Sequence, residues 1–159
     1  MSSEEENEII DEVEALLKDL NLGDSYTLKS ADKKSAHSQV IDAFKKYWNN
    51  KYPYFERYGQ QYIDFVGKDG RAEGHILLVM EVDARASGGV KNCVKLANTR
   101  STNKVWIHIS RSEDAQEQFD RALYDIQRLL VMREEDKESF GNFVAFLKTP
   151  EEVKKVVLL

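Results

Sequence analysis

Apolar residues recur at helical spacing in several parts of the chain. This spacing predicts helices over residues 4–20, 39–50, 90–97 and 112–132. The first helix should end near Gly23, and the last of these should begin at Ser112, whose hydroxyl would cap it. Thr149 followed by Pro150 predicts a short final helix, because proline is favoured in a first helical turn.

Four runs of apolar residues have the length and composition of β-strands. They cover residues 62–66, 75–83, 104–110 and 143–147, and the turn-forming sequence 67–70 joins the first two. The predicted order is α–α–β–β–α–β–α–β–α. This order favours an α/β fold, with one mixed β-sheet flanked by helices over residues 25–159. Residues 1–24 form an acidic amphipathic helix that serves either as an arm or as a packed helix.

Composition is consistent with a globular domain that has a sizeable core. The chain has 159 residues, of which 42% are apolar and 32% charged. Its longest apolar run, residues 76–80, is too short to cross a bilayer, and the acidic residues 2–6 are unlike a secretory signal. We therefore expect a cytoplasmic protein with no membrane partner. The single cysteine, Cys93, cannot form an internal disulfide and is predicted to be packed.

The net charge of −5 hides a strong asymmetry along the chain. Residues 1–24 contain nine acids and one lysine, whereas residues 84–111 contain six Lys or Arg and no acid. A basic segment can neutralise the phosphates of a nucleic acid. The alternative is a solvated helix face followed by a loop.

Three carboxylates interrupt the first two predicted strands. Alternate side chains of a strand share a face, so Glu81 and Asp83 should point the same way, and Asp64 can join them if the strands pair. Buried carboxylates repel one another, and a divalent cation relieves this repulsion. The alternatives are acids at solvated strand ends, with Asp64 paired to Lys104 or Arg71.

Residues 39–110 resemble the core of the PD-(D/E)xK nucleases, the restriction-endonuclease-like superfamily. In that core (αββαβ), a helix precedes two strands that carry Asp and then Glu-x-Lys, and a helix and a further strand follow. Asp64 matches the first acid of the motif and Glu81 the second, but Asp83 stands in the place of the lysine. Some members supply the lysine from the following helix, where Lys95 is the first candidate and Lys91 the second.

The resemblance implies a site that holds Mg²⁺ or Mn²⁺ and acts on DNA phosphodiesters. Asp64, Glu81 and Asp83 would be the metal ligands and, with Lys95, the catalytic residues of a magnesium-dependent endonuclease. Glu56 could correspond to an extra, helix-borne acid found in some members. The side chains expected to follow the nucleic-acid backbone are Arg85, Lys91, Arg100 and Lys104.

Two alternatives remain open on the sequence. One is a nuclease-like domain with reduced or lost activity, because the standard lysine is replaced. The other is a non-catalytic α/β interaction protein that binds a nucleic acid or a protein, or forms a homodimer through its acidic helix.

Overall fold

The structure is a computed structural model that describes residues 3–27, 32–57, 62–68, 75–84, 88–131 and 141–159. In chain order its elements are α1 (Ser3–Asp19), the 3-10 helix η1 (Gly23–Thr27), α2 (Ala36–Asn49), β1 (Phe55–Glu56), β2 (Phe65–Lys68), β3 (Ile76–Asp83), α3 (Gly89–Ala97), β4 (Asn103–Ile109), α4 (Ala115–Leu130), β5 (Asn142–Lys148) and β6 (Val153–Val157). Within these ranges, no helix is both long and apolar enough to pass through a membrane.

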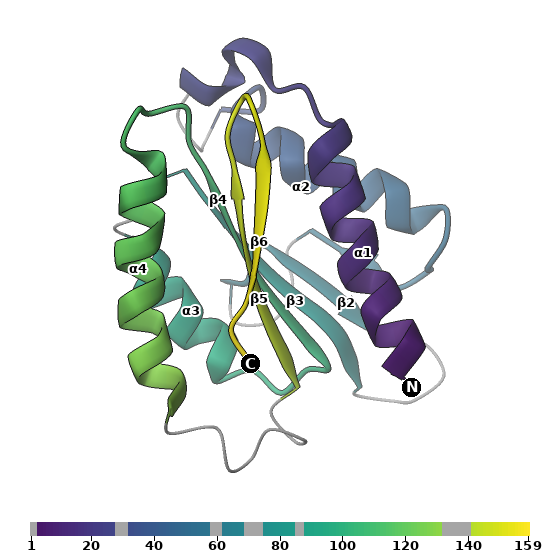
Figure 1. Ribbon diagram of the computed structural model, residues 1–159. Helices are drawn as coiled ribbons and strands as arrows, with labels where there is room; N and C mark the ends of the chain where they lie inside the picture. The colour runs from purple at the N-terminus through teal and green to yellow at the C-terminus, as the bar shows by residue number, and fades with distance from the viewer. Residues whose placement is uncertain (1–2, 28–31, 58–61, 69–74, 85–87, 132–140) are drawn as a thin grey trace.

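The strands form one sheet in the order β1-β2-β3-β4-β5-β6. β1, β2 and β3 are antiparallel, β3, β4 and β5 are parallel, and β6 returns antiparallel to β5. Parallel neighbours need a crossover connection, and α3 and α4 supply the two that this sheet requires. Figure 1 shows α1 and α2 on one face of the sheet and α3 and α4 on the other. The predicted α/β fold, a mixed sheet flanked by helices, is confirmed.

The helix α1 packs against the body of the domain. Its side chains Val13 and Leu17 are fully buried. The indole Nε1 of Trp48 donates a hydrogen bond to Glu12 Oε2 at 2.8 Å, which ties α1 to α2. Trp48 also stacks on Phe55, with ring centroids 4.9 Å apart. α1 is therefore tied to the rest of the fold by both apolar and polar contacts.

The opposite face of the sheet is built around Trp106. Its ring stacks on Phe119 of α4, with centroids 5.6 Å apart. α3 approaches the same ring so closely that a Cβ atom on Gly89 would lie 2.3 Å from Trp106 Cζ2. A glycine at the start of α3 thus lets this helix rest directly on the sheet.

The helix predicted after Thr149 is wrong, because the chain forms a hairpin there instead. The Thr149 N–H donates to the Glu152 carbonyl at 2.9 Å, and β6 then pairs with β5. β6 is rich in valine, and β-branched side chains fit a pleated strand better than a helix. Long-range pairing with β5 therefore overrides the local Thr-Pro signal.

Two predicted boundaries also move. β2 begins at Phe65, so Asp64 lies immediately before the strand and not inside it. α4 begins at Ala115 after Asp114, and Ser112 contributes its carbonyl to the preceding turn, not a hydroxyl cap. Helix ends are the least certain feature of any local pattern.

Candidate functional site

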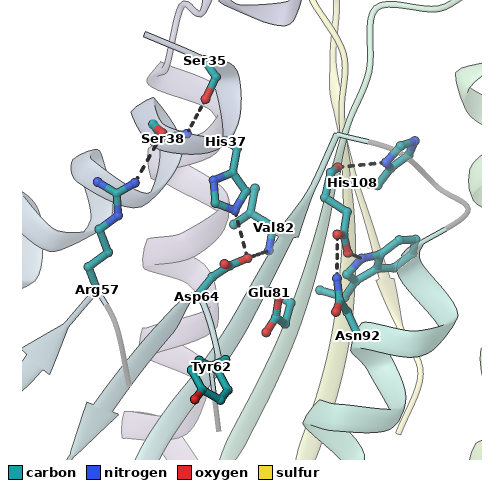
Figure 2. A network of polar contacts seen from close by, with 12 residues as sticks. Ser35, His37, Ser38, Arg57, Tyr62, Asp64, Glu81, Val82, Asn92 and His108 are labelled. Carbon is teal, nitrogen blue, oxygen red and sulfur yellow. Dashed lines mark hydrogen bonds and ion pairs between the residues drawn. The ribbon is translucent and has the colours of Figure 1, made fainter. Parts of the chain in front are cut away.

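Pairing of β2 with β3 brings two carboxylates together at one end of these strands. Phe65 pairs with Met80, so Asp64, which precedes β2, and Glu81, which follows Met80, are placed side by side. Asp64 Oδ2 accepts a hydrogen bond from the Val82 N–H at 2.8 Å (Figure 2). β2 begins only at Phe65, so its main chain does not pair with Val82. The Asp64 side chain accepts the Val82 N–H instead. The site is thus built by backbone pairing as well as by side chains.

The two carboxyl groups differ in their affinity for a proton. Glu81 is only 3% exposed, and burial together with the charge of Asp64 raises its pKa to about 8. Burial also acts on Asp64, but hydrogen bonding and charge from His37, with the Val82 N–H, hold its pKa below the ordinary value. Near neutral pH, Glu81 therefore carries the proton of the pair and Asp64 the negative charge.

Lys95 reaches this pair from α3. Its Nζ lies 3.0 Å from Glu81 Oε1 and 3.3 Å from the main-chain carbonyl of Tyr62. The interaction with Lys95 opposes the rise in the pKa of Glu81. The structure thus brings together Asp64, Glu81 and Lys95. The second candidate lysine, Lys91, lies one turn earlier on α3 and is exposed.

Asp83 shares the strand face of Glu81, but its carboxylate is engaged elsewhere. Asn92 Nδ2 donates to Asp83 Oδ1 at 2.6 Å, and Trp106 Nε1 donates to Oδ2 at 2.7 Å. Burial raises the pKa of Asp83 despite these two donors. Across the ranges that the structure describes, no three His, Cys, Asp or Glu side chains are grouped as a metal-ligand set. The expected convergence of three carboxylates is therefore corrected to a pair.

His37, in the first turn of α2, is a site residue that the sequence did not indicate. Its Nε2 lies 3.1 Å from Asp64 Oδ2, and its Nδ1 is buried without a hydrogen-bond partner. α2 begins three residues earlier than its apolar pattern predicts, because Ser35 caps it by accepting a hydrogen bond from the Ser38 N–H. That extra turn carries His37, which lies before the helix that the pattern predicts.

The basic residues expected to contact phosphate are not all available for that role. Lys104 is 1% exposed, and its Nζ donates to the Ser101 carbonyl at 3.1 Å. β4 is a central strand covered on both faces, so Lys104 cannot follow a nucleic-acid backbone, and its assignment as a binding residue is wrong. Arg100 is exposed, as is Lys91. Arg85 lies outside the described residues.

Glu56 and Arg71 are two further residues that the sequence suggested for the site or its partners. Glu56 is exposed on the edge strand β1, so it is not the helix-borne acid that was expected. Arg71, one of the alternative partners of Asp64, lies outside the described residues. His108 is a buried sheet histidine whose Nδ1 lies 3.1 Å from the Asp83 carbonyl, and burial lowers its pKa.

The donor set at Asp64 and Glu81 fits one hard divalent cation. Two adjacent buried carboxylates repel each other when both are ionised, so the pair retains a proton, and a cation can take the place of that proton. Mg²⁺ retains several waters and needs only one or two carboxylates. The N–H and C=O of one strand residue point to the same side, so the Val82 carbonyl faces the side where Asp64 lies and can serve as a third oxygen ligand.

Comparison with known proteins finds no matching family model, no matching curated protein and no matching solved structure. Function must therefore be argued from the site itself. The site consists of two carboxyl groups whose pKa values are shifted in opposite directions. Lys95 contacts Glu81, and His37 contacts Asp64.

Proposed function

We propose that the protein is a metal-dependent, nuclease-like domain of the restriction-endonuclease-like class that acts on or binds DNA phosphodiesters. The observation that carries the proposal is the Asp64–Glu81 pair with Lys95 Nζ 3.0 Å from Glu81. The order α2-β1-β2-β3-α3-β4 also supports it. The acids lie where β2 begins and within β3, and the lysine comes from the helix that crosses over to β4, as the resemblance leads one to expect.

Each side chain has a role that follows from its surroundings. A bound Mg²⁺ or Mn²⁺ would supply charge stabilisation to a phosphodiester and lower the pKa of a water molecule. Asp64, Glu81 and the Val82 carbonyl would hold the cation. Lys95 favours the ionised form of Glu81 that cation binding requires, and its ammonium group adds positive charge beside the reacting phosphate.

A second candidate, a domain with reduced or lost activity, is favoured by Asp83. This acid occupies the place of the usual lysine, and both of its oxygens accept hydrogen bonds inside the fold. Lys95 is then the cation nearest the pair among the described side chains, and it is already bound to Glu81. Such a domain would bind nucleic acid and metal without rapid cleavage.

Thermal unfolding in the presence of Mg²⁺ or Mn²⁺ tests the metal site. We expect the unfolding temperature of the wild type to rise with cation concentration, because a ligand present at about 100 times its Kd stabilises a protein by about 2.7 kcal/mol. Asp64→Asn combined with Glu81→Gln should abolish the rise. Asp125→Asn, at an exposed acid on α4, is the matched control and should respond as the wild type does. Equal curves for the wild type and the double variant would refute a metal site at this pair.

Plasmid nicking with Mn²⁺ then distinguishes an active nuclease from a domain that has lost its activity. Metal-dependent nicking that Glu81→Gln abolishes would support the nuclease. Metal-dependent stabilisation with no cleavage of either the plasmid or single-stranded DNA would support the inactive domain.

A further inference from the structure

Tyr62 combines two unfavourable features next to the carboxylate pair. Its side chain is 95% exposed, and it is the one non-glycine residue of the described chain with a positive φ, at 60°. A left-handed backbone costs a residue with a bulky side chain about 1–2 kcal/mol, and exposure of an aromatic ring forgoes the gain from its burial. Strain of this kind persists where the surrounding structure imposes it, and it is concentrated at ligand sites.

The site holds the main chain at Tyr62 and immediately after it. The carbonyl of Tyr62 accepts a hydrogen bond from Lys95 Nζ at 3.3 Å, and the same ammonium group lies 3.0 Å from Glu81 Oε1. In the next two positions, Ile63 is buried and Asp64 accepts a hydrogen bond from the Val82 N–H. The main chain is therefore held at the Tyr62 carbonyl and at the two residues that follow, while the exposed Tyr62 ring lies beside Asp64 and Glu81 (Figure 2).

An exposed aromatic ring beside a phosphodiester site fits the face of a nucleobase. Stacking of one base on an aromatic side chain contributes about 1–3 kcal/mol and does not depend on sequence. Bases within a duplex already stack on each other, so only an unpaired base can use the ring. The protein has a net charge of −5, and of its expected phosphate contacts Lys104 is buried. Stacking would supply affinity that cations do not.

We propose that Tyr62 is a base-stacking platform and that the substrate carries an unpaired nucleotide next to the phosphodiester at the carboxylate pair. The substrate class is then single-stranded or branched nucleic acid, not uninterrupted duplex. This inference rests on the proposed function, because it takes the carboxylate pair to be the place where the phosphodiester lies.

Fluorescence of 2-aminopurine, which stacking quenches, tests the proposal directly. The probe is a single strand about 12 nucleotides long, with the duplex of the same sequence as comparison, in EDTA and again with Mn²⁺. We expect the wild type to quench the single strand and bind it more tightly than the duplex. Tyr62→Phe should keep both properties. Tyr62→Asn should lose the quenching and weaken binding by about 5- to 150-fold, which corresponds to the stacking energy.

The choice of asparagine separates loss of the ring from loss of the fold. Asparagine tolerates the left-handed conformation, so Tyr62→Asn should be at least as stable as the wild type in chemical unfolding. Tyr124→Asn, at a tyrosine on α4 that is 63% exposed, is the matched control and should bind as the wild type does.

Three outcomes would overturn the proposal. Unchanged binding by Tyr62→Asn removes Tyr62 from the interface while leaving nucleic-acid binding intact. Tighter binding to the duplex than to the single strand refutes the substrate class. Absence of any binding by the wild type, with or without Mn²⁺, refutes both the platform and nucleic-acid binding, while metal-dependent thermal stabilisation reports separately on the carboxylate pair.

Discussion

Replacing Glu81 by glutamine should remove a large dependence of stability on pH. The pKa of Glu81 is about 8 in the folded protein, against an ordinary value of 4.5. The folded protein therefore retains a proton on Glu81 that the unfolded chain has released. The free energy of unfolding consequently falls as pH rises from about 4.5 to 8 and is level above that window. Glutamine has nearly the same shape and no proton to lose, so this fall should be absent from Glu81→Gln.

The size of the effect follows from the same two pKa values. One pKa unit corresponds to about 1.4 kcal/mol, so full expression of the difference would be about 5 kcal/mol. The window from pH 5 to pH 8.5 leaves out part of this range, and entry of water on ionisation relieves part of the cost. We therefore expect about 2–3 kcal/mol between pH 5 and pH 8.5. Asp64 does not obscure the result, because its lowered pKa acts only below pH 4.

Urea unfolding of the wild type and Glu81→Gln at pH 5 and pH 8.5 measures this effect. Glutamine replaces a carboxyl group that is protonated at pH 5 and mainly ionised at pH 8.5, so the informative quantity is the change in the difference between the proteins. Glu113→Gln, at an exposed acid, is the control and should follow the wild type at both pH values. If the difference between Glu81→Gln and the wild type is the same at pH 5 and pH 8.5, the account of the carboxylate pair is wrong.

The remaining predictions concern packing and the metal. Gly89→Ala should cost about 1–3 kcal/mol of unfolding free energy, because its Cβ would lie 2.3 Å from the Trp106 ring. Gly88→Ala, whose Cβ would meet its nearest neighbour at 3.7 Å, should cost much less. Leu17→Ala should lower the free energy of unfolding in urea by about 2–5 kcal/mol, because this side chain is fully buried. Leu129 is 44% exposed, and if Leu17→Ala costs as little as Leu129→Ala, then α1 is not packed. Apparent Mn²⁺ affinity, measured by calorimetry, should fall about tenfold for each pH unit below 8, because Glu81 must release its proton, and a pH-independent affinity would place the ion elsewhere.

Local patterns were sufficient for the parts of the fold that depend on neighbours in sequence. Alternation within a strand placed Glu81 and Asp83 on one face, and pairing of the two strands was expected from the turn predicted over 67–70. The strands do pair, although Gly67 and Lys68 belong to β2 and not to a turn. Together these two inferences bring Asp64 to Glu81. Helical spacing on α3 likewise directed attention to Lys95, which lies 3.0 Å from Glu81.

Contacts between distant segments were beyond the reach of such patterns. Lys104 is buried because β4 lies between β3 and β5 and helices cover both faces of the sheet. The residues next to Lys104 in sequence do not reveal this arrangement. His37 contacts Asp64 across 27 positions of sequence, and its helix begins at a serine cap that precedes the apolar pattern. Residue spacing predicts a face, but it does not predict which residue from another element lies opposite that face.

The two departures from the motif of the proposed nuclease class are connected by the structure. Asp83, in the place of the motif lysine, accepts a hydrogen bond from Asn92 on α3 at 2.6 Å. Asn92 and Lys95 are three positions apart and so lie on the same side of that helix. The contact between Asp83 and Asn92 therefore fixes the side of α3 that faces the sheet, and Lys95 on that side reaches Glu81. An acid at position 83 and a lysine supplied from α3 are thus compatible parts of one arrangement, in which the acid orients the helix that carries the lysine.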